Sequence, residues 1–121
     1  MFGVKIELLS LDGSRSVEIE AVVDTGATFT KVSRAVADDL GLVPQTRHRF
    51  RLGDNDVVTR DVGPLLIRFG GETVTILVAV GADGEIPVLG ATALESLGLW
   101  VDPAGHALIP RDAYELGMAS T

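Results

Sequence analysis

The stretch Ala21-Val22-Val23-Asp24-Thr25-Gly26-Ala27-Thr28 decides how this sequence folds and what chemistry it can carry. An apolar run ends in Asp24, which places the carboxyl group at the edge of a dry core, an environment that prepares it for proton exchange. Thr25 supplies a hydroxyl group for bonds to neighbouring backbone, and the small Gly26 and Ala27 allow close approach of a ligand backbone. A lone carboxylate is a weak catalyst, whereas two that share a proton can activate water and protonate a carbonyl oxygen.

Alternating apolar and polar residues on both sides of this stretch predict β-strands. Residues 4–8 and 17–23 flank an Asp-Gly turn and form a β-hairpin pattern. Ser33 can cap a short helix over 34–40, and a second short helix over 91–97 is closed by Gly98. Further strands are predicted at 47–52, 57–60, 64–69, 73–80, 99–101 and 107–110. The first two of these strands form a hairpin with its tip at 53–56.

We therefore predict one mainly β domain over residues 1–121, a closed barrel or sandwich-like sheet of seven or eight strands with two short helices. Fourteen of the 121 residues are glycine, above the average of about 7%, as expected for many tight turns. The length is enough to bury a core without cross-links. The tail after about residue 111 has no clear periodicity and is expected to be flexible.

Composition and charge exclude several classes of protein. Ten Lys and Arg against 17 Asp and Glu give a net charge of −7, which argues against a nucleic-acid partner. The absence of cysteine excludes disulfide scaffolds, thiolate zinc sites and cysteine nucleophiles. No apolar run is long enough to span a membrane, and the N-terminal residues lack the pattern of a signal peptide. We expect a soluble, cytoplasmic protein.

The segment Val22-Val23-Asp24-Thr25-Gly26-Ala27 resembles the catalytic motif of the retropepsin-like aspartic proteases, including small bacterial and archaeal members. In that family a second element, two apolar residues and a glycine before a helix, follows about sixty residues later. Val88-Leu89-Gly90 before the helix at 91–97 matches it. The hairpin with its tip at 53–56 lies where the family has a flap that closes over the substrate. The resemblance extends from about Val4 to Ile109 and implies a single-lobed acid-protease fold.

The resemblance implies a role for each matched position. Asp24 corresponds to the catalytic aspartate, Thr25 to the hydroxyl residue that braces the two active-site loops, and Gly90 to a structural glycine beside the loop. The family has no cofactor, and we expect none here. The positions expected to contact substrate are Gly26, Ala27, Gly53, Asp54, Asn55 and Asp56.

The chain carries a single Asp-Thr-Gly motif, since the acidic stretches near 12, 54 and 83 lack the apolar residues before an Asp-Thr/Ser-Gly order. A pair of aspartates then requires two chains related by a two-fold axis, and the resemblance implies a homodimeric endopeptidase that cleaves an extended peptide. The alternative is a catalytically silent peptide-binding or dimerisation module with the same fold. A regulatory domain derived from a longer ancestor is a third interpretation.

Two features depart from the retroviral pattern. The chain begins almost at the first hairpin, so the N-terminal strand of the dimer interface is short or missing, and the hairpin around 107–110 would replace it. The flap tip carries Asp54 and Asp56 where retroviral tips are glycine-rich and apolar. These carboxylates would disfavour acidic substrates at neutral pH.

Simpler interpretations exist for individual residues. Asp24 could cap the amides of a turn without any catalytic role. His48 and His106 are isolated in the sequence, and we predict no metal site. The basic run 47–51 places its arginines on one face of a strand, which we interpret as the outer face of the flap. Trp100 is expected in the core or in a dimer interface.

Overall fold

The computed structural model describes residues 2–102, 104 and 106–112. Within this part the chain forms nine strands and two short helices. In order they are β1 (Gly3–Leu9), β2 (Ser16–Val23), β3 (Thr30–Ser33), α1 (Arg34–Asp39), β4 (Thr46–Arg51), β5 (Val57–Phe69), β6 (Glu72–Gly81), β7 (Val88–Leu89), α2 (Ala91–Ser96), β8 (Leu99–Asp102) and β9 (Ala107–Pro110). The tail that was expected to be flexible lies, from residue 113 on, outside the described residues.

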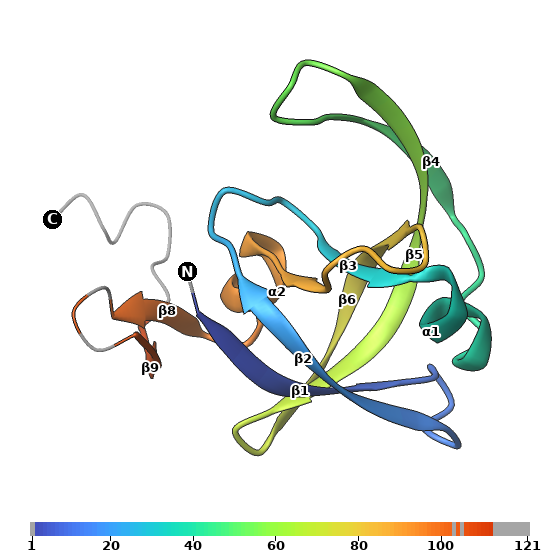
Figure 1. The fold of residues 1–121 in the computed structure, drawn as a ribbon. Helices are drawn as coiled ribbons and strands as arrows, with labels where there is room; N and C mark the ends of the chain where they lie inside the picture. Colours follow the sequence, from blue (N-terminus) through green and yellow to red (C-terminus); the bar gives the residue numbers. More distant parts are fainter. Residues whose placement is uncertain (1, 103, 105, 113–121) are drawn as a thin grey trace, which may run out of the picture.

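Seven strands form one sheet that closes on itself. Their order is β1-β2-β7-β3-β6-β5-β4, and β1 pairs with β5 as well as with β2, so that six of the strands make a ring (Figure 1). Strands β8 and β9 form a separate antiparallel hairpin beside this ring. The prediction of a mainly β, closed sheet with short helices is confirmed.

The interior of the ring is filled by the apolar positions that the alternation predicted. The predicted first hairpin is present, with β1 and β2 paired from Gly3 opposite Val22 to Leu9 opposite Ser16. Leu8 of β1, Ile67 of β5 and Val78 of β6 are completely buried. Because such side chains alternate along β1, β5 and β6, one face of these strands packs inward and the other face is more exposed.

The helices occur where they were predicted. The hydroxyl oxygen of Ser33 accepts a hydrogen bond from the amide of Val36 and so caps α1. Helix α2 follows β7 and contacts β6 and β8. Each helix contributes small or apolar side chains to the core, among them Ala37 and Ala93, which are buried.

The two strands predicted at 57–60 and 64–69 are in fact one strand, β5, with 13 residues. The Gly-Pro pair at 63–64 suggested a break, but Pro64 lies between two paired stretches on that side of β5. The stretch paired with β4 ends at Val62, and the stretch paired with β1 begins at Leu66. Because no strand pairs with β5 at Pro64 on this side, the missing amide hydrogen of proline costs no hydrogen bond between strands there, and β5 continues through it.

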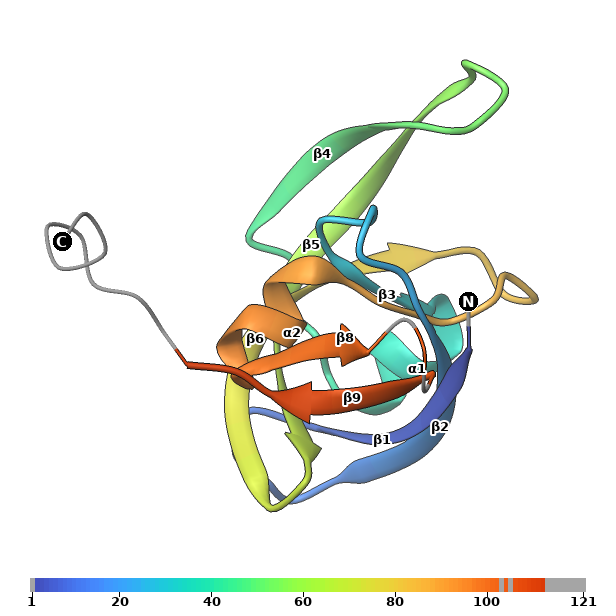
Figure 2. The same cartoon turned by 90° about the vertical axis from the view of Figure 1, so that its left-hand side faces the viewer.

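Strand β4 and the first half of β5 project beyond the ring as a long hairpin (Figures 1 and 2). Its tip is closed by hydrogen bonds from the Leu52 amide to the Asp56 carbonyl, 2.8 Å, and from the Asn55 amide to the Leu52 carbonyl, 3.0 Å. We call this hairpin, residues 46–62, the flap. It overhangs the turn that follows β2 (Figure 1).

Candidate active site

Asp24 lies where β2 leaves the sheet. The short parallel pairing with β7 ends with Val23 opposite Leu89, and the Asp24 amide donates a final bond to the Leu89 carbonyl, 3.0 Å. The chain then turns sharply: the Gly26 amide donates to Asp24 Oδ1 at 2.9 Å, and the Ala27 amide donates to the Asp24 carbonyl at 3.2 Å. We call residues 24–29 the catalytic turn, after the family motif that they resemble. Asp24 is partly exposed as a residue, and its carboxylate is held by its own turn.

The catalytic turn is docked on the start of α2 by three hydrogen bonds. The Ala91 amide donates to the Ala27 carbonyl at 2.7 Å. The Thr92 amide and hydroxyl both donate to the Thr28 carbonyl, at 3.1 and 2.8 Å. These bonds satisfy two carbonyl groups of the turn and hold it in one position relative to the helix.

Gly90 allows this docking because it leaves room for the turn. A Cβ atom at this position would lie 2.5 Å from the Phe29 carbonyl oxygen and 2.9 Å from that of Ala27. Its amide donates to the hydroxyl of Thr30, a completely buried residue, at 3.1 Å. The structure thus places Gly90 directly against the backbone that follows Asp24.

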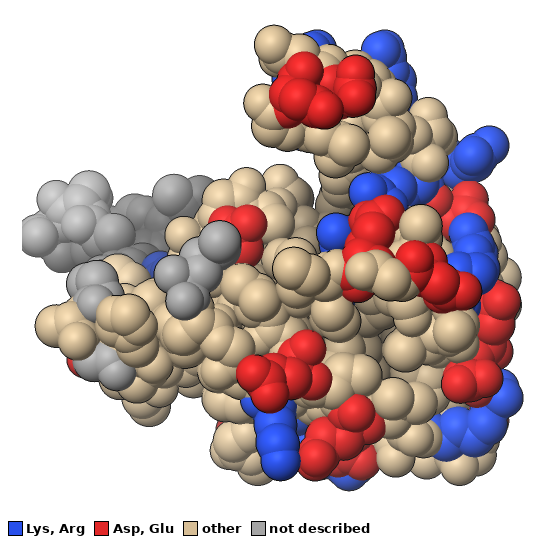
Figure 3. Space-filling model, in the orientation of Figure 1, with Lys and Arg blue, Asp and Glu red and all other residues tan. Residues whose placement is uncertain are grey.

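A cavity of about 720 Å³ opens between the catalytic turn and the flap. Among the predicted site residues, Asp24, Gly26, Ala27 and Gly53 line it, whereas Thr25 does not. The other predicted contacts at the flap tip, Asp54, Asn55 and Asp56, are exposed and do not line the cavity. Figure 3 shows acidic side chains gathered at the tip of the flap.

An aromatic cluster that the sequence did not reveal joins the turn to the flap. The ring of Phe29 lies 5.2 Å from that of His48 and 5.9 Å from that of Phe50, measured between centroids. His48 and Phe50 alternate on β4 and so share one face of it. That face is directed at the cavity floor. The histidine that appeared isolated in the sequence is therefore part of the cavity wall.

Three charged residues form an ion-pair cluster at the base of the flap. The Oε1 atom of Glu85 lies 2.9 Å from the guanidinium group of Arg60 and 3.1 Å from the ammonium group of Lys31. Its Oε2 atom accepts a hydrogen bond from Arg60 at 3.2 Å and another from the Ala82 amide at 3.1 Å. Partial burial raises the pKa of Glu85, but the hydrogen bonds from Arg60, Ala82 and Lys31 outweigh it and lower the pKa to about 2. We call Lys31, Arg60 and Glu85 the flap-base cluster.

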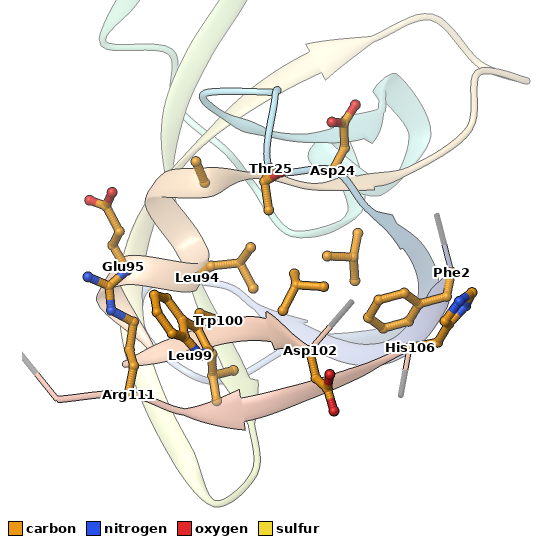
Figure 4. A pocket seen from close by; sticks show the side chains of 13 residues that line it. Phe2, Asp24, Thr25, Leu94, Glu95, Leu99, Trp100, Asp102, His106 and Arg111 are labelled. Carbon is orange, nitrogen blue, oxygen red and sulfur yellow. The ribbon is translucent and has the colours of Figure 1, made fainter. Parts of the chain in front are cut away.

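A second cavity, of about 660 Å³, lies on the other side of the catalytic turn, above the β8–β9 hairpin. Figure 4 shows the side chain of Thr25 directed into it, while the Asp24 carboxylate points away. Its lining is mostly apolar and includes Phe2, Leu94 and Trp100. Trp100 is 54% exposed, although it is a large apolar residue.

Within the described residues, no group of three or more His, Cys, Asp and Glu side chains is arranged to hold a metal ion. In the same part of the chain, no helix has the length and apolar character needed to cross a membrane.

The closed sheet, the flap and the catalytic turn are the features of the retropepsin-like aspartic-protease fold. A family model described as aspartyl protease matches residues 9–93, and the chain belongs to this family. The match includes the catalytic turn, the flap and Gly90. No curated protein matches the chain.

Among solved structures, the EIAV protease complexed with the inhibitor HBY-793 is similar in fold, with a TM-score of 0.56. The similarity covers 80% of this chain and 88% of that chain at 20% sequence identity. At this identity the likeness concerns the fold.

Proposed function

We propose that this chain is an aspartic endopeptidase that acts as a homodimer, with the Asp24 carboxylates of two chains sharing one proton. The observation that carries the proposal is the position of Asp24: its carboxylate is fixed by a tight turn and lines a cavity beneath an overhanging hairpin. The chain has a single such motif, so a second copy must supply the partner carboxylate.

The proposed reaction uses the two carboxyl groups as base and acid. The ionised one takes a proton from a water molecule, whose oxygen bonds to the scissile carbonyl carbon, while the protonated one gives its proton to the carbonyl oxygen. Collapse of the tetrahedral intermediate breaks the C–N bond: the leaving nitrogen takes the proton that the first carboxyl group accepted from water, and the second carboxylate takes a hydroxyl proton of the intermediate, which restores the pair. The pair titrates as a unit, which favours an acid-to-neutral optimum.

The proposed substrate is an extended peptide lying in the cavity beneath the flap. Backbone groups of Gly26 and Ala27 on one side and the flap on the other would bond to the peptide as strands do. Gly53 already lines the cavity, and flap closure would bring the backbone of Asp54, Asn55 and Asp56 toward the peptide.

The proposed dimer face is the side of the molecule that carries the second cavity. Thr25 lines this cavity, and in the proposed dimer the two Thr25 residues brace the two catalytic turns. The β8–β9 hairpin extends the same face (Figure 2). Burying its exposed Trp100 and the neighbouring apolar lining would favour association.

Cleavage assays test the proposed activity. Casein and a peptide library are incubated from pH 4 to 7 with the wild type and with Asp24→Asn, which keeps the size of the side chain. We expect cleavage by the wild type only. A folded, dimeric wild type that cleaves no better than the variant would favour the silent binding or dimerisation module instead.

Sedimentation equilibrium tests the shared pair. We expect the mass of two chains at high micromolar concentration, and a mass of one chain there would exclude a mechanism with one aspartate from each copy. We also propose a cytoplasmic location, as the composition suggested, which cell fractionation can test.

A further inference from the structure

The cavity beneath the flap is lined by more basic than acidic residues, although the whole chain has ten basic and 17 acidic ones. The basic residues are Lys31, Arg49, Arg51 and Arg60, and the acidic one is Asp24. Arg49 and Arg51 alternate with His48 and Phe50 along β4, so their side chains belong to the opposite face of that strand. Lys31 and Arg60 are therefore the cations that a ligand in the cavity can meet.

The flap-base cluster leaves an excess positive charge in the cavity wall. Two cations surround one carboxylate, so the cluster has a net charge of +1. Arg60 is bound to both carboxylate oxygens of Glu85, whereas Lys31 donates a single bond to Oε1. Since an ammonium group has three donor hydrogens, Lys31 has donors left for a ligand.

Both cations are partly withdrawn from solvent, which strengthens their action on a ligand. The side chain of Lys31 is 25% exposed and that of Arg60 is 12% exposed. A bond from a charged donor to a carboxylate is roughly twice as strong as a neutral one, and screening by salt is weaker at such a site than on the surface. An acidic side chain that reached Lys31 would complete the cluster as two cations and two carboxylates.

We propose that Lys31, held in place by Glu85 and Arg60, forms a specificity subsite that selects an acidic side chain of the peptide. This inference rests on the proposed function and adds the class of substrate to it. It reverses the expectation drawn from the acidic flap tip, because Asp54 and Asp56 do not line the cavity.

The sheet register gives the distance of this subsite from the cleaved bond. Lys31 pairs with Val88, and Val88 pairs with Val22, so Lys31 lies two strand spacings, about 10 Å, from Val22 on the strand that leads to Asp24. An extended peptide rises about 3.3 Å per residue. The acidic residue should therefore occur about three or four positions from the scissile bond. A two-fold dimer would repeat the preference on both sides of it.

Paired peptides test the subsite. The probes are alanine octapeptides with a central Phe-Leu pair, which carry Glu or the isosteric Gln at one outer position at a time. For the wild type we expect kcat/KM to be at least tenfold higher for Glu than for Gln at the third or fourth position on each side. In Lys31→Met this ratio should fall to about one, and in Lys31→Arg it should be largely retained.

Lys5→Met is the matched control, since it makes the same substitution and the same change of net charge at an exposed position outside both cavities. We expect it to keep the wild-type ratio. The absence of a Glu preference at every position, or a preference that survives in Lys31→Met, would overturn the subsite.

A binding series separates this inference from the proposed activity. The same peptides, labelled with a fluorophore, are titrated with Asp24→Asn and with the double variant that also carries Lys31→Met, and anisotropy is measured. Tighter binding of Glu than Gln peptides that is lost in the double variant supports the subsite even when no cleavage is found. Cleavage without any acidic preference in either assay would refute the subsite and leave the protease proposal intact.

Discussion

Replacement of Gly90 by alanine tests whether the catalytic turn depends on its contact with the start of α2. The added methyl group would lie 2.5 Å from the Phe29 carbonyl oxygen, 2.6 Å from the Phe29 carbonyl carbon and 2.9 Å from the Ala27 carbonyl oxygen. All three are backbone atoms, which cannot rotate away as the end of a side chain can. The turn and the helix must therefore move apart.

The cost has two parts. Forcing an extra methyl group into a packed site costs about 1–3 kcal/mol. Separation also weakens the bonds from the Ala91 amide to Ala27 and from the Thr92 amide to Thr28, each of which contributes about 1 kcal/mol. We therefore expect Gly90→Ala to lower the free energy of unfolding by about 3–5 kcal/mol, a large part of the 5–15 kcal/mol typical of such proteins.

Urea denaturation followed by Trp100 fluorescence measures this loss. Gly53→Ala is the control, because no atom lies within 4 Å of a Cβ built there, and we expect a change of about 0.5 kcal/mol or less. Both variants are compared at one protein concentration, since a dimer couples unfolding to concentration. A loss below about 1 kcal/mol in Gly90→Ala would show that the turn relaxes easily and would refute the packing argument.

Two further predictions concern the flap base and the dimer face. Because the pKa of Glu85 is lowered to about 2 from an ordinary 4.5, its carboxylate stabilises the fold fully above about pH 4.5 and loses this effect toward pH 2. The difference in free energy of unfolding between wild type and Glu85→Gln, measured by thermal unfolding, should therefore decrease as the pH falls from about 4.5 to 2. A difference that stays constant over this range would contradict the prediction. Trp100→Ala should raise the dimer dissociation constant at least tenfold in sedimentation equilibrium. Val43 is 70% exposed and lies outside both cavities, so the control variant Val43→Ala should leave this constant unchanged.

Features that depend on local pattern could be predicted from the sequence. The alternation around the first hairpin determines which side chains face inward, and the run ending in Asp24 indicates a strand that stops at a polar turn. The order of motif, hairpin and Val88-Leu89-Gly90 then indicated the family. Short strands were harder to find, because four residues at 30–33 give too little alternation to separate a strand from a loop.

Features that depend on topology could not be predicted. Lys31, Arg60 and Glu85 are separated by 25 to 54 residues, and they meet because β3, β5 and the loop before β7 converge at one edge of the cavity. Phe29 and His48 are likewise joined only when the flap folds over the turn. Periodicity indicates the face on which a side chain lies but does not identify the strand that lies opposite.

The separation of charge within the chain bears on how a peptide would be selected. The exposed carboxylates at the flap tip act through solvent, where physiological salt screens them beyond about 8 Å. They can therefore slow the approach of an acidic peptide but contribute little once it is bound. In the proposed subsite, Lys31, one quarter exposed and held by Glu85, would act on the bound peptide at short range. In the proposed dimer the net charge is twice the −7 of one chain, yet in the proposed subsite a bound peptide would meet the positive flap-base cluster.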